Sequence, residues 1–185
     1  LTEFLTTVAG EGIDARWEQR VTFARVMLMG ITALHSARIV HTDLKPDNLL
    51  LLPNPHAPGS FHLKLIDLDW SIFSDRQAPW HGKGVGYVGT PGYLSPEHLR
   101  GEVPSEGSDV FTCALMLGEL LGGGHPFAHH RGEDAMARAV LGGHFQPFRL
   151  MRAIDKVKES GHLEALVNLA LHPELYRRPT AAALR

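Results

Sequence analysis

Apolar residues recur at steps of three and four between residues 15 and 36. These positions are Trp17, Val21, Ala24, Leu28, Ile31 and Leu34. Such spacing places side chains on one face of a helix, so it predicts a long, partly buried helix over 15–36. A shorter helix is expected before it at residues 1–8, because glycines at positions 10 and 12 interrupt the pattern.

Two short apolar runs after this helix predict a β-hairpin. The strand candidates are residues 49–52 and 61–66, and the connecting segment 53–60 contains three prolines and a glycine. Proline cannot donate to a ladder of backbone hydrogen bonds, so this segment should form the turn. We expect the hairpin to leave Asn48 and Asp67 at the same edge.

The remaining chain predicts helices around one long irregular segment. Residues 68–97 show neither a helix nor a strand period, and such length without secondary structure is usually functional in a compact domain. A helix capped by Ser108 or Asp109 is expected to reach Leu121 and to end at three glycines. Further helices are predicted over residues 132–141, 149–159, 162–171 and from Thr180 onward. The predicted fold class is therefore mainly α with a small β-hairpin.

Composition fits one globular domain over residues 1–185. The chain is 44% hydrophobic and has a net charge of −2, so it lacks the basic field that nucleic acid or anionic lipid would attract. The sequence contains no run of about 18 uncharged apolar residues, so it predicts no membrane-spanning helix. The single cysteine, Cys113, excludes a disulfide framework, and we expect an intracellular, cytoplasmic location.

The stretch from residue 41 to 48, His-Thr-Asp-Leu-Lys-Pro-Asp-Asn, concentrates polar side chains at the start of an apolar strand. Asp43 can orient a hydroxyl or accept its proton, and Lys45 can neutralise charge on a phosphate. Asn48 and Asp67 offer the hard oxygen ligands that Mg²⁺ prefers. These residue types together predict a loop for phosphoryl transfer.

This stretch resembles the catalytic loop of eukaryotic-type protein kinases, H-R-D-L-x-x-x-N. Further motifs follow in the order of that family: Asp67-Leu68-Asp69 for D-F-G, residues 89–97 (GTPGYLSPE) for G-T-x-x-Y-x-x-P-E, Asp109-Val110-Phe111, and Arg178-Pro179-Thr180. The resemblance implies a protein-kinase C-lobe over residues 1–185. It also implies a catalytic loop at 41–48 and an activation segment at 67–97.

Five residues are expected to carry catalysis and nucleotide binding: Asp43, Lys45 and Asn48 the catalysis, and Lys45, Asn48, Leu50 and Asp67 the nucleotide and its metal ion. Asp43 resembles the catalytic aspartate, and Lys45 resembles the lysine that contacts the transferred phosphate. Asn48 and Asp67 resemble the ligands of Mg²⁺, for which Mn²⁺ is an alternative. Leu50 would contribute to the apolar floor under the adenine of ATP.

Three further residues are expected to contact a protein substrate. Thr90 resembles the residue that contacts the catalytic aspartate and lysine in Ser/Thr kinases, so it implies Ser/Thr rather than Tyr specificity. Asp47 and Glu119 stand where kinases that prefer basic substrates carry acidic residues, which implies an arginine upstream of the target hydroxyl.

Four residues are expected to have structural roles. Glu97 and Arg178 resemble the ion pair that fixes the peptide-binding segment. Asp109 resembles the carboxylate that binds the backbone of the catalytic loop. His41 is expected to be a packed, hydrogen-bonded imidazole rather than an acid or base.

The chain departs from the family pattern in three places. Thr42 replaces the arginine that pairs with a phosphorylated activation loop, so activity should not depend on loop phosphorylation. Asp69 replaces a glycine, which either adds a cation ligand or hinders the turn. No glycine-rich strand, strand lysine or partner glutamate precedes residue 41, so we expect the N-lobe to be absent from this chain.

Three functions remain open. The first is a Ser/Thr protein kinase in which the full-length protein supplies the N-lobe and this excerpt alone is inactive. The second is a pseudokinase that serves as a binding scaffold, suggested by Thr42 and Asp69. The third is a small-molecule phosphotransferase, since aminoglycoside-type kinases share a similar loop and an I-D-x-D strand end like residues 66–69.

Overall fold

The computed structural model describes residues 1–8, 16–57, 60–78, 89–151 and 157–185. Its helices are α1 (Thr2–Val8), α2 (Trp17–Ser36), α3 (Pro96–Arg100), α4 (Glu106–Leu121), α5 (Glu133–Gly142), α6 (Val157–Ala170) and α7 (Ala181–Leu184). Its strands are β1 (Ile39–Val40), β2 (Leu49–Pro53), β3 (Phe61–Leu65) and β4 (Ile72–Phe73), and short 3₁₀ turns span Pro46–Asn48 and Leu175–Arg177. The predicted helix-rich fold is confirmed.

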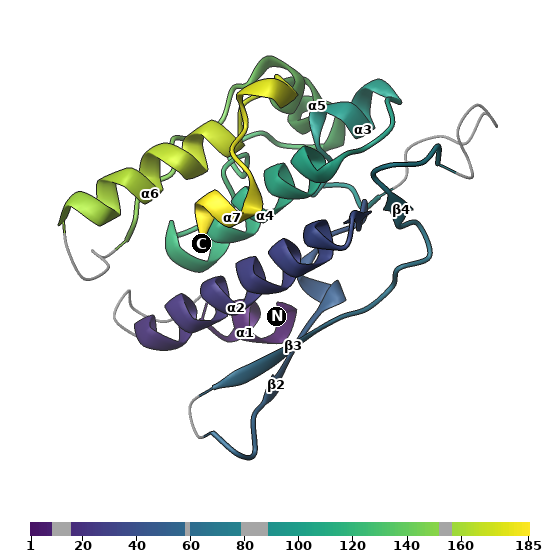
Figure 1. Ribbon diagram of the computed structural model, residues 1–185. Coiled ribbons are helices and arrows are strands. Elements are labelled where there is room, and N and C mark those ends of the chain that lie inside the picture. The colour runs from purple at the N-terminus through teal and green to yellow at the C-terminus, as the bar shows by residue number, and fades with distance from the viewer. Residues whose placement is uncertain (9–15, 58–59, 79–88, 152–156) are drawn as a thin grey trace.

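Helix α4 forms the centre of the core. Thirteen of its residues are buried, and it packs between α2 and α6 (Figure 1). Ile31 from α2 and Met116 from α4 are both fully buried. Cys113 lies in the same core as a free thiol, and burial raises its pKa. The predicted amphipathic helix over 15–36 is therefore one wall of this core.

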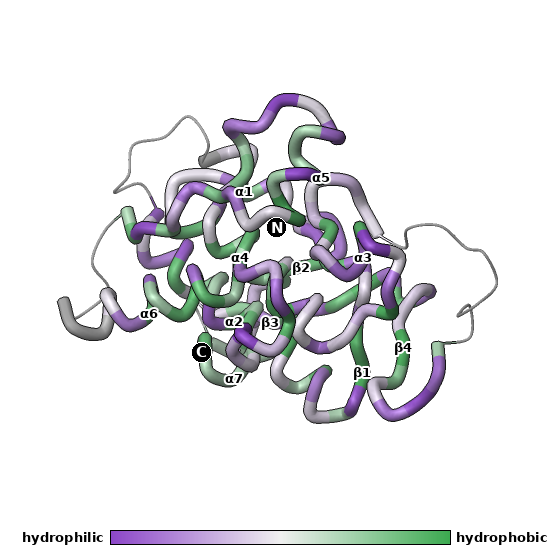
Figure 2. The backbone as a smooth tube through the Cα atoms, turned by 90° about the horizontal axis from the view of Figure 1, so that it is seen from above, coloured by the Kyte–Doolittle hydropathy of each residue, from purple (hydrophilic) through white to green (hydrophobic). Residues whose placement is uncertain are grey.

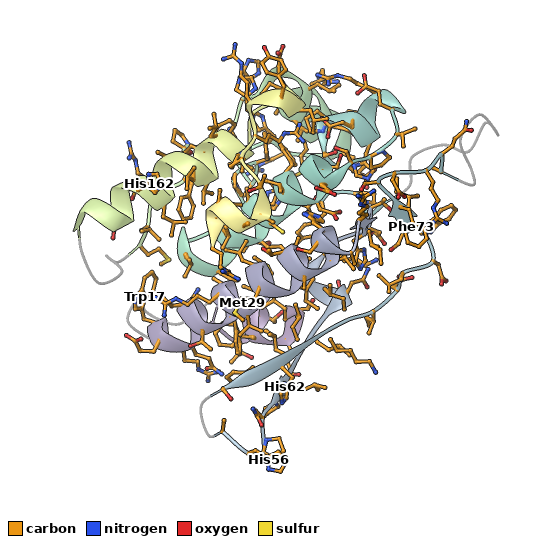
Figure 3. The ribbon with its side chains drawn as sticks, viewed as in Figure 1. Trp17, Met29, His56, His62, Phe73 and His162 are labelled. Carbon is orange, nitrogen blue, oxygen red and sulfur yellow. The ribbon has the colours of Figure 1, made fainter. Side chains whose placement is uncertain are left out.

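The predicted hairpin is present as the antiparallel pair β2 and β3, with Leu49 opposite Leu65. Strand β3 packs against α2, and Figure 3 shows His56 at the far end of the hairpin. Beyond the ladder, the Ile66 amide donates to the Asn48 carbonyl at 3.1 Å. Asn48 and Asp67 consequently lie at the same edge of the hairpin, as the pattern predicts.

A second small sheet lies inside the segment expected to be irregular. Strand β4 pairs antiparallel with β1, placing Val40 opposite Ile72, and Figure 2 shows the two apolar strands side by side. Val40 and Ile72 are buried. The prediction of no secondary structure over 68–97 was wrong here, because two residues are too short a run to show a period.

The predicted start of the helix α4 was also wrong. Its N-cap is Ser105, three residues before Ser108, and the Ser108 hydroxyl instead accepts from the Ser105 amide at 3.0 Å. This reciprocal arrangement is a capping box, in which the third helical residue binds back to the cap.

The predicted helices 149–159 and 162–171 correspond to one helix, α6. Residues 149–151 are not helical, because segment 148–151 binds to α6 instead. The Leu150 amide donates to Glu164 at 2.9 Å, and the Phe148 amide, just before the predicted helix, donates to Asn168 at 2.7 Å. The helix at residues 132–141 and the one after Thr180 are present as α5 and α7.

Among the described helices, none combines the length and the apolar character needed to cross a membrane.

Candidate active site

Asp43, Lys45 and Thr90 form a hydrogen-bonded triad. Thr90 Oγ1 donates to Asp43 Oδ1 at 2.8 Å and accepts from Lys45 Nζ at 2.9 Å. Lys45 Nζ also lies 3.4 Å from Asp43 Oδ2. Asp43 is 8% exposed, so its carboxylate faces few water molecules. The triad joins the 41–48 loop to the 89–97 segment and holds a carboxylate and an ammonium together.

Asp109 at the start of α4 holds the backbone of the 41–48 loop. Its carboxylate accepts from the His41 amide at 2.8 Å, from the Thr42 amide at 3.1 Å and from His35 Nε2 at 2.9 Å. His41 itself is fully buried and donates through Nε2 to the Ile66 carbonyl at 3.1 Å. Asp109 and His41 are thus both hydrogen-bonded to backbone groups inside the protein, and their structural role stays a prediction.

Thr42 has a left-handed backbone, with φ of 70°. This conformation is costly for a β-branched residue and persists only where neighbouring groups hold it. Its hydroxyl donates to the Trp70 carbonyl at 3.0 Å, and its side chain is buried. Thr42 therefore has hydrogen-bond partners inside the protein at the place where the family carries an arginine.

Asn48 and Asp67 are the candidate metal ligands. Asn48 is buried and its Nδ2 donates to the Asp43 carbonyl at 2.9 Å, which leaves Oδ1 as the atom for a cation. Asp67 is exposed and has φ of 61°. Within the described residues no three His, Cys, Asp or Glu side chains gather as a metal site. An amide and a carboxylate suit Mg²⁺, which takes its other ligands from phosphate and water.

Glu97 and Arg178 form a buried, two-pronged ion pair. Arg178 Nη2 donates to Glu97 Oε1 at 2.7 Å and Nη1 donates to Oε2 at 2.9 Å. The hydroxyls of Ser95 and Ser108 also donate to Oε2, at 2.7 Å and 3.0 Å. Burial would raise the pKa of Glu97, but these hydrogen bonds and the Arg178 charge hold it below its usual value. The pair thereby fixes α3 against the core.

Glu119 lies next to Tyr93 in a partly buried setting. The Tyr93 hydroxyl is 3.1 Å from both carboxylate oxygens. Burial raises the pKa of Glu119 to about 7, and the hydrogen bond from Tyr93 opposes this rise. The pKa of Tyr93 is raised by burial and then by the charges of Glu119 and Asp47. The sequence analysis did not single out Tyr93.

Asp47 and Leu50 are the two most exposed members of the predicted set apart from Asp67. Asp47 accepts from the Thr2 hydroxyl at 2.9 Å. Leu50 is 37% exposed on the hairpin, whereas the neighbouring Leu49 is fully buried. Leu50 thus presents apolar surface close to Asn48. The glycine-rich stretch 84–88, together with Trp80 and Tyr87, lies outside the described residues.

Comparison with known proteins identifies the family. The model of the protein kinase domain matches residues 4–185. Serine/threonine-protein kinase PkaB of Streptomyces coelicolor is 38% identical over 106 residues, which cover 54% of this chain and 25% of that kinase. Calcium/calmodulin-dependent protein kinase type II of Caenorhabditis elegans is 43% identical over 101 residues, which cover 55% of this chain and 13% of that kinase.

The type IV calcium/calmodulin-dependent protein kinase of Mus musculus is 39% identical over 116 residues, covering 62% of this chain and 23% of that kinase. Each match therefore spans a quarter or less of the relative's length. The family model nevertheless covers nearly the whole chain and includes every residue of the site described above. This chain belongs to the protein kinase family.

Proposed function

We propose that the full-length protein containing this chain is a Ser/Thr protein kinase. The observation that carries the proposal is the triad of Asp43, Thr90 and Lys45. It joins a carboxylate that can receive a hydroxyl proton to an ammonium that can neutralise charge on phosphate. The threonine between them comes from the segment expected to bind the protein substrate.

The proposed reaction transfers the γ-phosphoryl group of ATP to a Ser or Thr hydroxyl. The hydroxyl oxygen forms a bond to phosphorus, the bond from phosphorus to the ADP oxygen breaks, and Asp43 receives the hydroxyl proton. Lys45 stabilises the negative charge on the phosphoryl oxygens. Asn48 and Asp67 would hold Mg²⁺, with Mn²⁺ as an alternative, and this cation would supply charge neutralisation on the phosphates when bound.

We also propose that residues 1–185 form the C-terminal lobe of a two-lobed domain. No G-x-G-x-x-G stretch precedes residue 41, and the described part of residues 1–40 is mostly helical, in α1 and α2. The exposed Leu50 would then complete an adenine pocket with residues of the other lobe. Residues 1–185 alone should transfer phosphate poorly, because the other lobe's part of the adenine pocket would be missing. An intracellular location stays a prediction.

Competing acceptors test the proposed substrate class. The full-length protein is incubated with Mg²⁺, radiolabelled ATP, a basic Ser/Thr peptide mixture, matched Tyr peptides and a set of small alcohols. We expect phosphoserine and phosphothreonine as products. Label found only on small alcohols would overturn the proposal and favour the phosphotransferase alternative.

A pseudokinase scaffold is the second candidate, favoured by Asp69 beside the metal ligand and by Thr42. A scaffold of this kind needs no phosphate transfer. Binding of Mg²⁺-ATP and transfer to peptide, both lost in Asp67→Ala, would argue against it. Binding of a protein partner without any transfer would favour it.

A further inference from the structure

Three segments meet at the carbonyl oxygen of Thr42. His98 of α3 lies 2.9 Å from this oxygen through its Nε2, and the backbone of Gly89 passes alongside. A carbonyl oxygen can only accept, so Nε2 must carry the proton and donate. His98 is 4% exposed and Thr42 is 3% exposed, so water contributes little to this contact. The bond therefore connects α3 directly to the 41–48 loop.

The other two polar groups of Thr42 are held by different elements. Its amide donates to Asp109 of α4, and its hydroxyl donates to the carbonyl of Trp70. Each of the three bonds opposes relaxation of the left-handed backbone, which is an unfavourable conformation for a β-branched residue. His98 supplies the only one of these three that acts on the carbonyl.

The Thr42 carbonyl belongs to the same planar peptide unit as the Asp43 amide. Fixing the direction of that oxygen fixes the plane, and the plane sets the direction in which Asp43 leaves the chain. Asp43 must point at Thr90 and at the hydroxyl that it serves. A rotation of this peptide would move the carboxylate while leaving the core intact.

His98 is itself held in place from behind. Its Nδ1 accepts from the Ser95 amide at 3.3 Å and lies 2.7 Å from Ser95 Oγ, whose hydroxyl also reaches Glu97. Burial lowers the pKa of His98, while the Thr42 carbonyl and the charges of Asp109, Glu97 and Asp43 oppose this. The neutral imidazole with its proton on Nε2 suits the contact, because Nδ1 is then free to accept from the Ser95 amide.

Building on the proposed kinase function, we propose that His98 is a positioning residue for the catalytic carboxylate. It transmits the position of the Glu97–Arg178 anchor through α3 to the peptide that precedes Asp43. The hydrogen bond from His98 thereby holds the catalytic loop (41–48) in place against the end of the activation segment (67–97), without a phosphorylated residue in that segment. No arginine is needed at position 42 for this connection.

The test uses steady-state kinetics of the full-length protein with three variants. His98→Leu removes both polar contacts at similar volume. His98→Gln places an amide nitrogen near the former Nε2, whereas His98→Asn reaches only as far as Ser95. Asn168→Leu is the matched control. It removes the hydrogen bonds that Asn168 of α6 makes with the Phe148 backbone, and it touches none of the residues of the candidate site.

We expect His98→Leu to lower kcat about 10-fold or more, in line with the effect of small misplacements of catalytic groups. The KM for peptide should stay within about twofold. His98→Gln should restore kcat to near the wild-type value, and Asn168→Leu should lower Tm without lowering kcat. If His98→Leu does not fold, a higher kcat in His98→Gln than in His98→Asn carries the same conclusion.

Equal kcat values in the wild type and His98→Leu would overturn the inference, as would equal values in His98→Gln and His98→Asn. A wild-type protein that transfers no phosphate at all would instead overturn the proposed kinase function. The two failures are thus distinguished by the wild-type rate in the same assay.

Discussion

Thr90 donates its hydroxyl proton to Asp43 at 2.8 Å, although the two residues are 47 positions apart in sequence. The same hydroxyl accepts from Lys45, so one threonine orients both charged groups of the site. This arrangement makes correct placement of the 89–97 segment a condition for a correctly oriented carboxylate. Under the proposed kinase function, this one side chain would link the binding of a protein substrate to the orientation of the catalytic carboxylate.

Replacement of Thr90 by Val should lower kcat roughly 10- to 100-fold, because a hydrogen bond to a charged group contributes about 1.5–3 kcal/mol. Thr90→Ser keeps the hydroxyl and should retain most of the activity. Initial rates with a saturating peptide substrate give this comparison. A loss in Thr90→Ser as large as that in Thr90→Val would contradict this prediction, because serine keeps the hydroxyl that makes both hydrogen bonds.

Replacement of Glu97 by Gln should destabilise the fold by about 3–5 kcal/mol, because it leaves the buried Arg178 charge without its counter-ion. The exposed pair Arg38–Asp75, at 3.3 Å, provides the control. Asp75→Asn should change stability by less than about 1 kcal/mol. Urea unfolding of both variants measures the difference, and similar losses would contradict a dominant role for the buried pair.

The depressed pKa of Glu97 also predicts how stability depends on pH. A carboxyl whose pKa is lower in the folded state stabilises the fold above its unfolded pKa, for which the usual value is 4.5. That contribution is lost as pH falls from this value through the lower folded pKa. Unfolding curves between pH 7 and pH 3 should therefore show a smaller acid-induced loss in Glu97→Gln than in the wild type.

Recognition of a basic substrate should strengthen as pH rises. With a pKa of about 7, Glu119 is ionised in about a tenth of molecules at pH 6 and about nine tenths at pH 8. An arginine in the peptide should therefore lower KM more at pH 8 than at pH 6. Glu119→Gln should remove this pH dependence, and a wild-type dependence that survives in the variant would assign it to another group.

Activity should not depend on phosphorylation of the activation segment. Thr42 is buried and bonded to Trp70, and it offers no charge to a phosphate. Treatment of the full-length protein with a phosphatase should leave kcat unchanged within about twofold. A tenfold loss after treatment, with recovery on rephosphorylation, would show that another basic residue receives the phosphate.

Long periodic segments and the kinase motifs allowed much of the fold to be predicted. Helix α2, with its apolar residues at steps of three and four, and the two strands of the hairpin, β2 and β3, appear where the sequence indicates them. The β1–β4 pair could not be predicted, because Val40 and Ile72 pair through the tertiary fold and each strand has only two residues. The segment at 149–151 was misassigned because the Leu150 amide binds to Glu164 and the Met151 amide binds to the Leu121 carbonyl, rather than to carbonyls of a helix of their own.

The candidate site could likewise be predicted from the sequence only in part. Asp43, Lys45 and Thr90 were expected to meet, and the structure brings them together. His98 and Tyr93 were not singled out, because neither has a pattern of its own and their importance depends on which buried groups they reach. A buried histidine needs a hydrogen-bond partner, but the burial of His98 follows from the tertiary fold and not from the mostly polar residues around it.

Phosphate transfer by the full-length protein with Asp43→Asn tests the central claim most directly. The measurement is the initial rate of label transfer from ATP to a Ser/Thr peptide, with Glu174→Gln, at an exposed position, as the control. We predict that Asp43→Asn lowers kcat by roughly 10²- to 10⁴-fold, the range typical of a lost general base, while the control equals the wild type. An Asp43→Asn protein that transfers phosphate at the wild-type rate would contradict the account.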